Sequence, residues 1–259
     1  GIAEQNGIGI SAGLASENFT VFSSTFTPFQ TMRCLEQIKV NLCYMNLPVN
    51  LVGLASGLVL GDLGYTHCSI EDVGVMRALP NMTVISPADC GETSKAVFAA
   101  AKYNRPVYIR LTGGTNNEIV YKNNYDFEIG KAIKILSGEG VALVCTGTMV
   151  AKAINASKQL NQHDIYPSVY NFHTIKPIDQ KTLNNICKKY KLIITIEEHN
   201  IIGGLGSAVS EIIVQNESNI KQVFMGVKDN YLISGDYETI LNKMGLNEDH
   251  IIKEVKNNI

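Results

Sequence analysis

Short apolar runs alternate with longer stretches of helical spacing along the first half of the chain. The runs are rich in valine and isoleucine and predict buried strands at 19–23, 49–53, 83–86 and 107–111. Between them, apolar positions at helical spacing predict helices over 27–44 and 90–102. The second of these helices begins beside Asp89, which is a favourable N-cap residue. This alternation is typical of a parallel sheet covered by helices.

A change of amino-acid composition after residue 111 predicts a linker between two domains. The sequence becomes Thr-Gly-Gly-Thr-Asn-Asn and then stays polar and rich in asparagine up to residue 126. A second alternation follows, with strands predicted at 141–145, 166–172 and 192–197 and helices at 149–160 and 181–189. We therefore expect an α/β protein of two three-layer domains, the first with a mostly parallel sheet, covering residues 1–120 and 121–259.

Composition and charge exclude several classes of function. The 259 residues are 45% hydrophobic, which is enough to bury a sizeable core, and their formal net charge is −2. Lysines and acidic residues are interspersed, so neither a basic stripe for nucleic acid nor a basic patch for a membrane surface is present. The longest apolar stretch, 47–60, is too short and too interrupted to span a membrane. We expect small molecules and other protein chains as partners, and no nucleic acid or membrane.

The cysteines and the first residues bear on the cellular compartment of the protein and on its N-terminus. The six cysteines lie far apart and form neither a CxxC motif nor a disulfide framework. We therefore expect reduced, mostly buried thiols in a cytoplasmic protein. The sequence opens on Gly-Ile-Ala-Glu with no initiator methionine and no signal pattern, and we expect that some N-terminal sequence is missing.

Two motifs of the second half carry groups that could bind a ligand. The glycine-rich turn 203–206 opens a predicted helix and could bind a phosphate, although its spacing matches neither a dinucleotide fingerprint nor a P-loop. Tight packing of strand against helix is the favoured alternative. Glu197, Glu198 and His199 could suggest a metal, but adjacent residues on a strand point to opposite faces. A polar rim at a strand end or a subunit contact is the favoured interpretation.

His67 and Glu4 are the candidates in the first half. His67 lies in a loop after an apolar strand, where parallel sheets place groups that contact ligands. Glu4 lies at the start of an apolar helix pattern over 8–14, where a carboxylate is also favoured by the helix dipole alone. A structural histidine is the corresponding alternative for His67. Spacing alone does not decide between these interpretations.

Five segments of the first half form a pattern that no single motif provides. They are Gly-Ile-Ala-Glu-Gln-Asn at 1–6, Ser-Thr-Phe-Thr-Pro-Phe at 24–29, Gly-Asp-Leu-Gly-Tyr-Thr-His at 61–67, Leu-Pro-Asn-Met at 79–82 and Ile-Arg at 109–110. In order and spacing they resemble the pyrimidine-binding domain of transketolases and 1-deoxyxylulose-5-phosphate synthases. The resemblance continues in Lys-Pro-Ile-Asp at 176–179, Thr-Ile-Glu-Glu-His at 195–199 with the glycine turn, and Met-Gly-Leu at 244–246. It implies a thiamine diphosphate pyrimidine-binding domain followed by a transketolase C-terminal domain.

The resemblance implies that the chain binds thiamine diphosphate. Glu4 matches the glutamate that hydrogen-bonds the N1′ nitrogen of the aminopyrimidine. That bond favours the imino tautomer, which removes the thiazolium C2 proton, so Glu4 is implied to be catalytic as well as cofactor-binding. Phe26 matches the aromatic residue that stacks on the pyrimidine, and Phe29 matches a second wall of the pocket. Met32 stands at a third wall, where transketolases often carry tyrosine.

The same resemblance implies the substrate-binding residues. His67 matches the histidine that contacts the donor as the covalent adduct forms, which implies a catalytic role. Arg110 matches an arginine that clamps a substrate phosphate, and Asp62, in the His67 segment, is also predicted to bind substrate. Leu63 replaces a usual aspartate and Ala55 a second histidine. These departures argue against phosphorylated aldoses and favour a modified or unusual ketose or acyl group.

One motif of the family is absent from the sequence. No Gly-Asp-Gly, which with a later asparagine holds Mg²⁺ and the diphosphate, occurs in the chain. We therefore expect no metal ligands here and a partner, the N-terminal transketolase subunit with the diphosphate-binding domain, in an α2β2 heterotetramer. The implied activity is transfer of a two-carbon ketol unit between sugars or sugar-like substrates. The alternatives are an acyl-transferring relative, like 1-deoxyxylulose-5-phosphate synthase or the β subunit of 2-oxoacid dehydrogenase E1, and a noncatalytic regulatory subunit.

Overall fold

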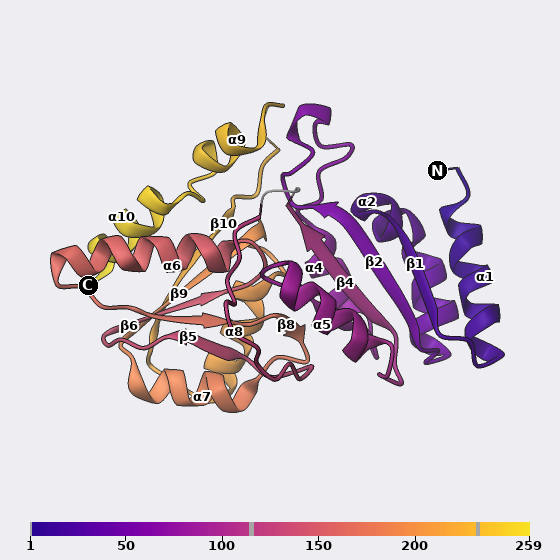
Figure 1. Ribbon diagram of the computed structural model, residues 1–259, viewed down its shortest axis with the longest axis horizontal. Coiled ribbons are helices and arrows are strands. Elements are labelled where there is room, and N and C mark those ends of the chain that lie inside the picture. The colour runs from indigo at the N-terminus through magenta and orange to yellow at the C-terminus, as the bar shows by residue number, and fades with distance from the viewer. Residues whose placement is uncertain (1, 114–116, 232–233) are drawn as a thin grey trace.

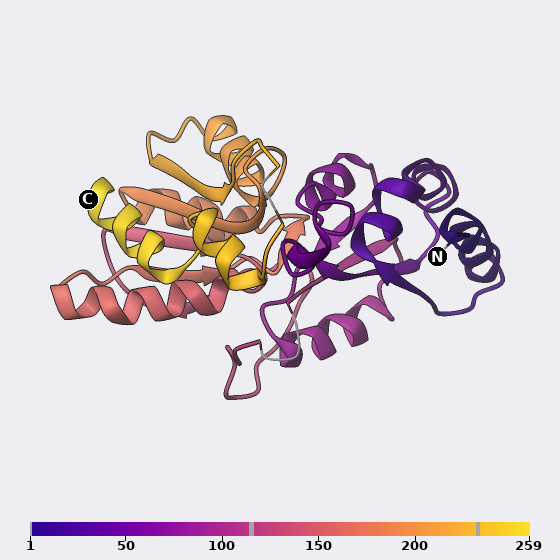
Figure 2. The same cartoon turned by 90° about the horizontal axis from the view of Figure 1, so that it is seen from above.

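The computed structural model describes residues 2–113, 117–231 and 234–259. Within these residues the strands form two five-stranded sheets that lie side by side, each packed against helices (Figure 1). Seen from above, helices cover both faces of the two sheets, as expected for three-layer α/β domains (Figure 2). Among the described helices, none combines the length and the apolar character that crossing a membrane requires.

The first sheet comes mostly from the first half of the chain. Its strand order is β1-β2-β4-β3-β8, where β8 is Thr174–Lys176, and the first four of these strands are parallel. The strands of the first half are β1 (Val21–Phe26), β2 (Val49–Ser56), β3 (Thr83–Ile85) and β4 (Val107–Thr112). The main helices beside them are α1 (Glu4–Ser16), α4 (Asp72–Ala78) and α5 (Cys90–Ala100). All four predicted strands are confirmed, and Asp89 caps α5 by accepting from the amide of Glu92 at 2.7 Å.

The stretch predicted to be helical, 27–44, is helical except at Thr31, but it is not one regular helix. The segment is divided into α2 (Thr27–Gln30), the 3₁₀ turn η1 (Met32–Cys34), α3 (Leu35–Gln37) and the π-helical η2 (Ile38–Tyr44). The first break is at Thr31, whose φ and ψ are −106° and −84°. Its hydroxyl and its amide both donate to the carbonyl oxygen of Thr27, at 2.7 and 3.0 Å, and a side-chain bond of this kind often bends a helix.

The second sheet lies wholly in the second half. Its order is β10-β9-β6-β7-β5, with only β5 antiparallel to its neighbour. The strands are β5 (Ile133–Leu136), β6 (Val141–Cys145), β7 (Ser168–Asn171), β9 (Leu192–Asn200) and β10 (Lys221–Val227). The helices are α6 (Met149–Leu160), α7 (Gln180–Lys189), α8 (Leu205–Gln215), α9 (Tyr237–Lys243) and α10 (Glu248–Asn258), with the 3₁₀ turn η4 (Asn161–His163). The sequence patterns predicted the strands and helices up to α8 but not β5, β10, α9 or α10.

The two halves share one sheet. The strand β8 (Thr174–Lys176) belongs to the second half, yet it pairs antiparallel with β3 and completes the first sheet. Part of the polar linker is hydrogen-bonded to the first half, because the second carboxylate oxygen of Asp89 accepts from the amides of Val120 and Tyr121 at 2.8 and 3.0 Å. Four of the six cysteines are buried, and burial raises the pKa of Cys68 to about 11.

Candidate functional site

The carboxyl end of β1 carries a cluster of ring side chains. Phe26 is the last residue of β1, Phe29 follows on α2, and His67 lies in the loop after β2 and the 3₁₀ turn η3 (Gly61–Leu63). The ring centroid of His67 is 5.4 Å from that of Phe29 and 6.3 Å from that of Phe26, in edge-to-face arrangements. Phe26 remains 41% exposed, so this apolar wall is open to a ligand at the edge where parallel sheets bind them.

Glu4 reaches this cluster through Arg33. Its Oε1 accepts from Nη1 of Arg33 at 3.2 Å, and the guanidinium carbon of Arg33 lies 4.0 Å from the ring centroid of Phe29. Only 8% of the Glu4 side chain is exposed, because Glu4 heads the buried stripe of α1 that continues with Ile8 and Ala12 at steps of four residues. Hydrogen bonding from its own backbone amide, reinforced by Arg33, keeps the pKa of Glu4 below its ordinary value despite the burial.

The structure thus brings Glu4, Phe26, Phe29 and His67 together. Met32 on η1 and Asp62 on η3 are exposed, and the functional roles of all six residues stay predictions. Sequence reasoning missed Arg33, although its position four residues after Phe29 is the spacing at which side chains meet on successive helical turns.

Arg110 is hydrogen-bonded within its own chain, which does not support the expected contact with a substrate, and that role stays a prediction. The residue is 2% exposed, and its Nε and Nη2 donate to the carboxylate of Asp72 at 2.7 and 3.3 Å. Nη1 donates to the hydroxyl of Thr112 at 2.8 Å, and Nη2 also donates to the carbonyl oxygens of Ser69 at 3.2 Å and Glu198 at 2.9 Å. The guanidinium is therefore surrounded by acceptors of its own chain.

Glu197, Glu198 and His199 are buried, so the expected polar rim is wrong. Glu197 accepts from the amides of Leu205 and Gly206 at 2.6 and 2.8 Å. The chain's own carboxylate thus occupies the N-terminus of α8, where a phosphate was one interpretation, and the glycine turn serves strand-to-helix packing. Burial raises the pKa of Glu197 to about 7 in spite of these bonds. No group of three or more histidine, cysteine or acidic side chains suited to a metal ion occurs in the described part of the chain.

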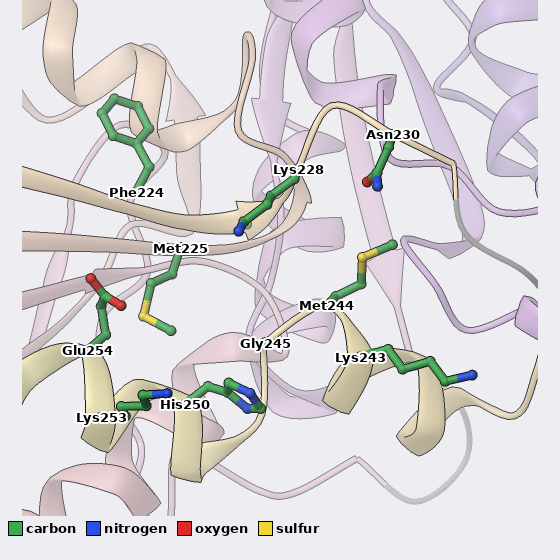
Figure 3. A pocket seen from close by; sticks show the side chains of 11 residues that line it. Phe224, Met225, Lys228, Asn230, Lys243, Met244, Gly245, His250, Lys253 and Glu254 are labelled. Carbon is green, nitrogen blue, oxygen red and sulfur yellow. The ribbon is translucent and has the colours of Figure 1, made fainter.

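A separate cavity of about 360 Å³ lies in the second half, between the end of β10 and the α9–α10 turn (Figure 3). Met225 and Met244 line it together with Lys228, His250 and Lys253. None of the site residues predicted from the sequence contributes to its walls. The cluster around Glu4 is therefore identified by its chemistry and not by the size of a cavity.

Comparison with protein families gives a match for each half of the chain. The family described as transketolase, pyrimidine binding domain, matches residues 1–116, and the family described as transketolase, C-terminal domain, matches residues 130–251. The chain belongs to the transketolase family. The resemblance inferred from the motifs and the order of the two folds are confirmed.

Several transketolase relatives have a similar extent. A putative transketolase C-terminal section of Methanocaldococcus jannaschii is 38% identical over 98% of this chain and 80% of its own length. One of the subunits of the apulose-4-phosphate transketolase of Actinobacillus succinogenes is 37% identical over 97% of this chain and 81% of its own length. A solved structure described as a split-gene transketolase, an inactive β4 tetramer, is 36% identical, with a TM-score of 0.89 over 99% of this chain and 81% of that one.

Proposed function

We propose that this chain is the C-terminal subunit of a thiamine diphosphate-dependent, transketolase-like enzyme that transfers a two-carbon ketol unit between sugars or sugar-like substrates. The observation that carries the proposal is the position of Glu4, a carboxylate of lowered pKa and 8% exposure that Arg33 links to Phe29 of the aromatic wall. An aminopyrimidine presents a flat face to aromatic rings and a ring nitrogen to a carboxylate, so these residues fit that half of the cofactor.

Each residue has a defined task in this proposal. Glu4 holds the N1′ nitrogen of the pyrimidine, while Phe26, Phe29 and Met32 enclose the ring and exclude water. When bound, thiamine diphosphate supplies the carbon nucleophile that takes up the ketol unit. The hydroxyl of Thr66 lies 3.0 Å from Nδ1 of His67, so we assign Nε2 as the nitrogen that hydrogen-bonds the donor's carbonyl or hydroxyl oxygen.

The anionic end of the cofactor is assigned to a second polypeptide. The sequence has no Gly-Asp-Gly motif. We propose an N-terminal subunit with the diphosphate-binding domain, which holds Mg²⁺, and an α2β2 heterotetramer. The need for such a partner is supported by two relatives, one named as a single subunit of its transketolase and the other as an inactive β4 tetramer. A cytoplasmic location is part of the proposal, because six cysteines without a disulfide framework suit a reducing compartment.

The test combines the purified chain, its partner subunit, thiamine diphosphate, Mg²⁺ and an aldehyde acceptor with a panel of ketose donors and, in parallel, with pyruvate as the donor. Ketol transfer that requires both subunits is the expected result. Product formed with pyruvate as donor, but with none of the ketoses, would assign the acyl-transferring alternative. Bound cofactor without turnover of any donor would assign the regulatory alternative. Glu4→Gln should lower kcat by about 100-fold with the cofactor still bound. Glu36→Gln, an exposed glutamate on α3, is the matched control and should leave kcat unchanged.

A further inference from the structure

The loop 57–69, which carries His67, is closed at its base. The amide of Gly57 donates to the carbonyl oxygen of Ser69 at 2.8 Å, and the amide of Ser69 donates back to that of Gly57 at 2.9 Å. Within the loop, the carbonyl oxygen of Gly64 accepts from the amides of His67 and Cys68 at 3.0 and 3.1 Å. His67 is thus hydrogen-bonded within the loop and stands two residues before Ser69 at its base, so a shift of the base is expected to move His67.

The first end of the loop is fixed by Glu198 on β9 of the second sheet. Oε1 of this glutamate accepts from the amide of Leu58 at 2.7 Å, while Oε2 accepts from the hydroxyls of Thr148 at 2.9 Å and Tyr237 at 2.6 Å. Glu198 is 2% exposed. Gly57 has a φ of +72°, and a Cβ built there would collide with the Glu198 carboxylate. The carboxylate and the loop are thus in direct contact, with no room for a side chain between them.

The rest of the loop is also held from the second half. Arg110 joins the other end to β9, because its Nη2 donates both to the carbonyl oxygen of Ser69 and to that of Glu198. In the middle, the carbonyl oxygen of Gly61 accepts from the amide of Gly235 at 3.2 Å. The side chain of Ile240 on α9 packs against Gly61, leaving no space for a Cβ.

We propose that Glu198 is a positioning residue for the reaction: it anchors the loop 57–69, and through the loop it sets the place of His67. The second half of the chain would then control the geometry of a substrate-binding residue from the first half. The role assigned to His67 rests on the proposed function, whereas the anchoring of the loop does not. Removal of the carboxylate leaves the Leu58 amide and two hydroxyls without their acceptor in a buried place, so the loop is expected to shift.

The first test uses amide hydrogen exchange of the chain, which needs neither cofactor nor partner. Glu198→Ala should speed exchange over 57–69 by about 10-fold or more, whereas Glu198→Gln keeps an acceptor for Leu58 and should stay near wild type. The matched control is Glu197→Ala, because Glu197 is equally buried on β9 but serves the amides of α8. It should destabilise α8 without speeding exchange in the loop. Gly57→Ala perturbs the same contact from the loop side and replaces Glu198→Ala if that variant does not fold.

The second test measures kinetics in the assembled enzyme. Glu198→Ala should lower kcat/KM for the ketose donor by about 10- to 100-fold, as expected for a misplaced substrate-binding group. Affinity for thiamine diphosphate should stay unchanged, because Glu4, Phe26 and Phe29 lie outside the loop. Unchanged loop exchange in Glu198→Ala, or an equal loss of kcat/KM in Glu197→Ala, overturns the proposal. If wild-type enzyme shows no ketol transfer, the proposed function fails while the exchange experiment still decides whether Glu198 anchors the loop.

Discussion

Replacing Arg110 by methionine tests whether this arginine is structural or binds a substrate. Methionine fills a similar volume without a charge, so the variant leaves the fully buried carboxylate of Asp72 without its ion pair. One donor remains, since the hydroxyl of Tyr108 donates to Oδ2 of Asp72 at 2.7 Å. A hydroxyl stabilises a buried negative charge far less than a guanidinium at the same distance.

The size of the effect follows from these contacts. Removing one partner of a buried ion pair costs about 3–5 kcal/mol, because the other charge stays buried. The acceptors on Ser69, Thr112 and Glu198 also lose a donor, while the Tyr108 hydroxyl offsets part of the loss. We therefore expect Arg110→Met to lower the free energy of unfolding by about 4 kcal/mol at pH 7.

The pH dependence of this loss has a defined sign. Burial is the largest single influence and would raise the pKa of Asp72, but attraction to Arg110 and His199, together with the hydrogen bonds from Arg110 and Tyr108, holds the pKa below its ordinary value. In the wild type, the contribution of Asp72 to stability is therefore present above its unfolded pKa and is lost as pH falls through the folded pKa. In Arg110→Met the folded pKa lies above the unfolded value, so the stability of the variant declines as pH rises through it. The deficit should thus be smaller at pH 4 than at pH 7.

Urea unfolding followed by circular dichroism at both pH values measures this difference. The double variant Asp72→Asn with Arg110→Met removes both charges and should recover part of the loss, because no buried ion remains. A loss below about 1 kcal/mol at pH 7, combined with a raised KM for phosphorylated donors only, would refute this reasoning and support Arg110 as a phosphate-binding residue.

Three further predictions concern other contacts. Asp89→Ala should cost about 2 kcal/mol in urea unfolding, because the carboxylate caps α5 and binds two linker amides; Asp89→Asn should cost less. Burial lowers the pKa of His173 to about 4, so in the wild type the free energy of unfolding falls as pH drops from 6 to 4.5. His173→Phe retains a ring at the position whose centroid lies 4.3 Å from that of Phe127 and should reduce the slope of this fall by about 1.4 kcal/mol per pH unit. Arg33→Met should raise the pKa of Glu4 and move the acid limb of the kcat profile to higher pH; an unmoved limb would contradict the coupling.

The elements predicted most accurately from the sequence are those buried along their whole length or along one regular face. The strand 141–145 is buried along its whole length, and α6 begins and ends at the predicted residues because its buried face follows the helical period. The break after Gln30 was not predictable in this way, since the apolar spacing continues through Thr31 although its backbone dihedral angles are not helical. The pairing of β8 with β3 was equally hidden, because a strand's own pattern does not identify the sheet that it joins.

In the candidate site, too, features set by nearby residues were predictable from the sequence, whereas contacts between residues far apart in the sequence were not. Glu4, Phe26 and Phe29 were found from motifs, and the burial of Glu4 agrees with its spacing from Ile8 on α1. The contact of Glu4 with Arg33 joins residues 29 positions apart, and no periodicity reports such a pair. A motif also cannot distinguish an arginine that faces a ligand from one that faces its own chain.

The contacts of Arg110 and Glu198 show that the two sides of the predicted linker are not structurally independent. A cut near residue 120 would separate two sheets, but it would also remove β8 from the edge of β3 and the acceptor from the amide of Leu58. Arg110 would lose the Glu198 carbonyl oxygen. Buried donors without acceptors are costly, so the first half alone should not keep the loop that carries His67 in place. The two family domains therefore meet at this loop, and the geometry of the proposed substrate site is a property of both.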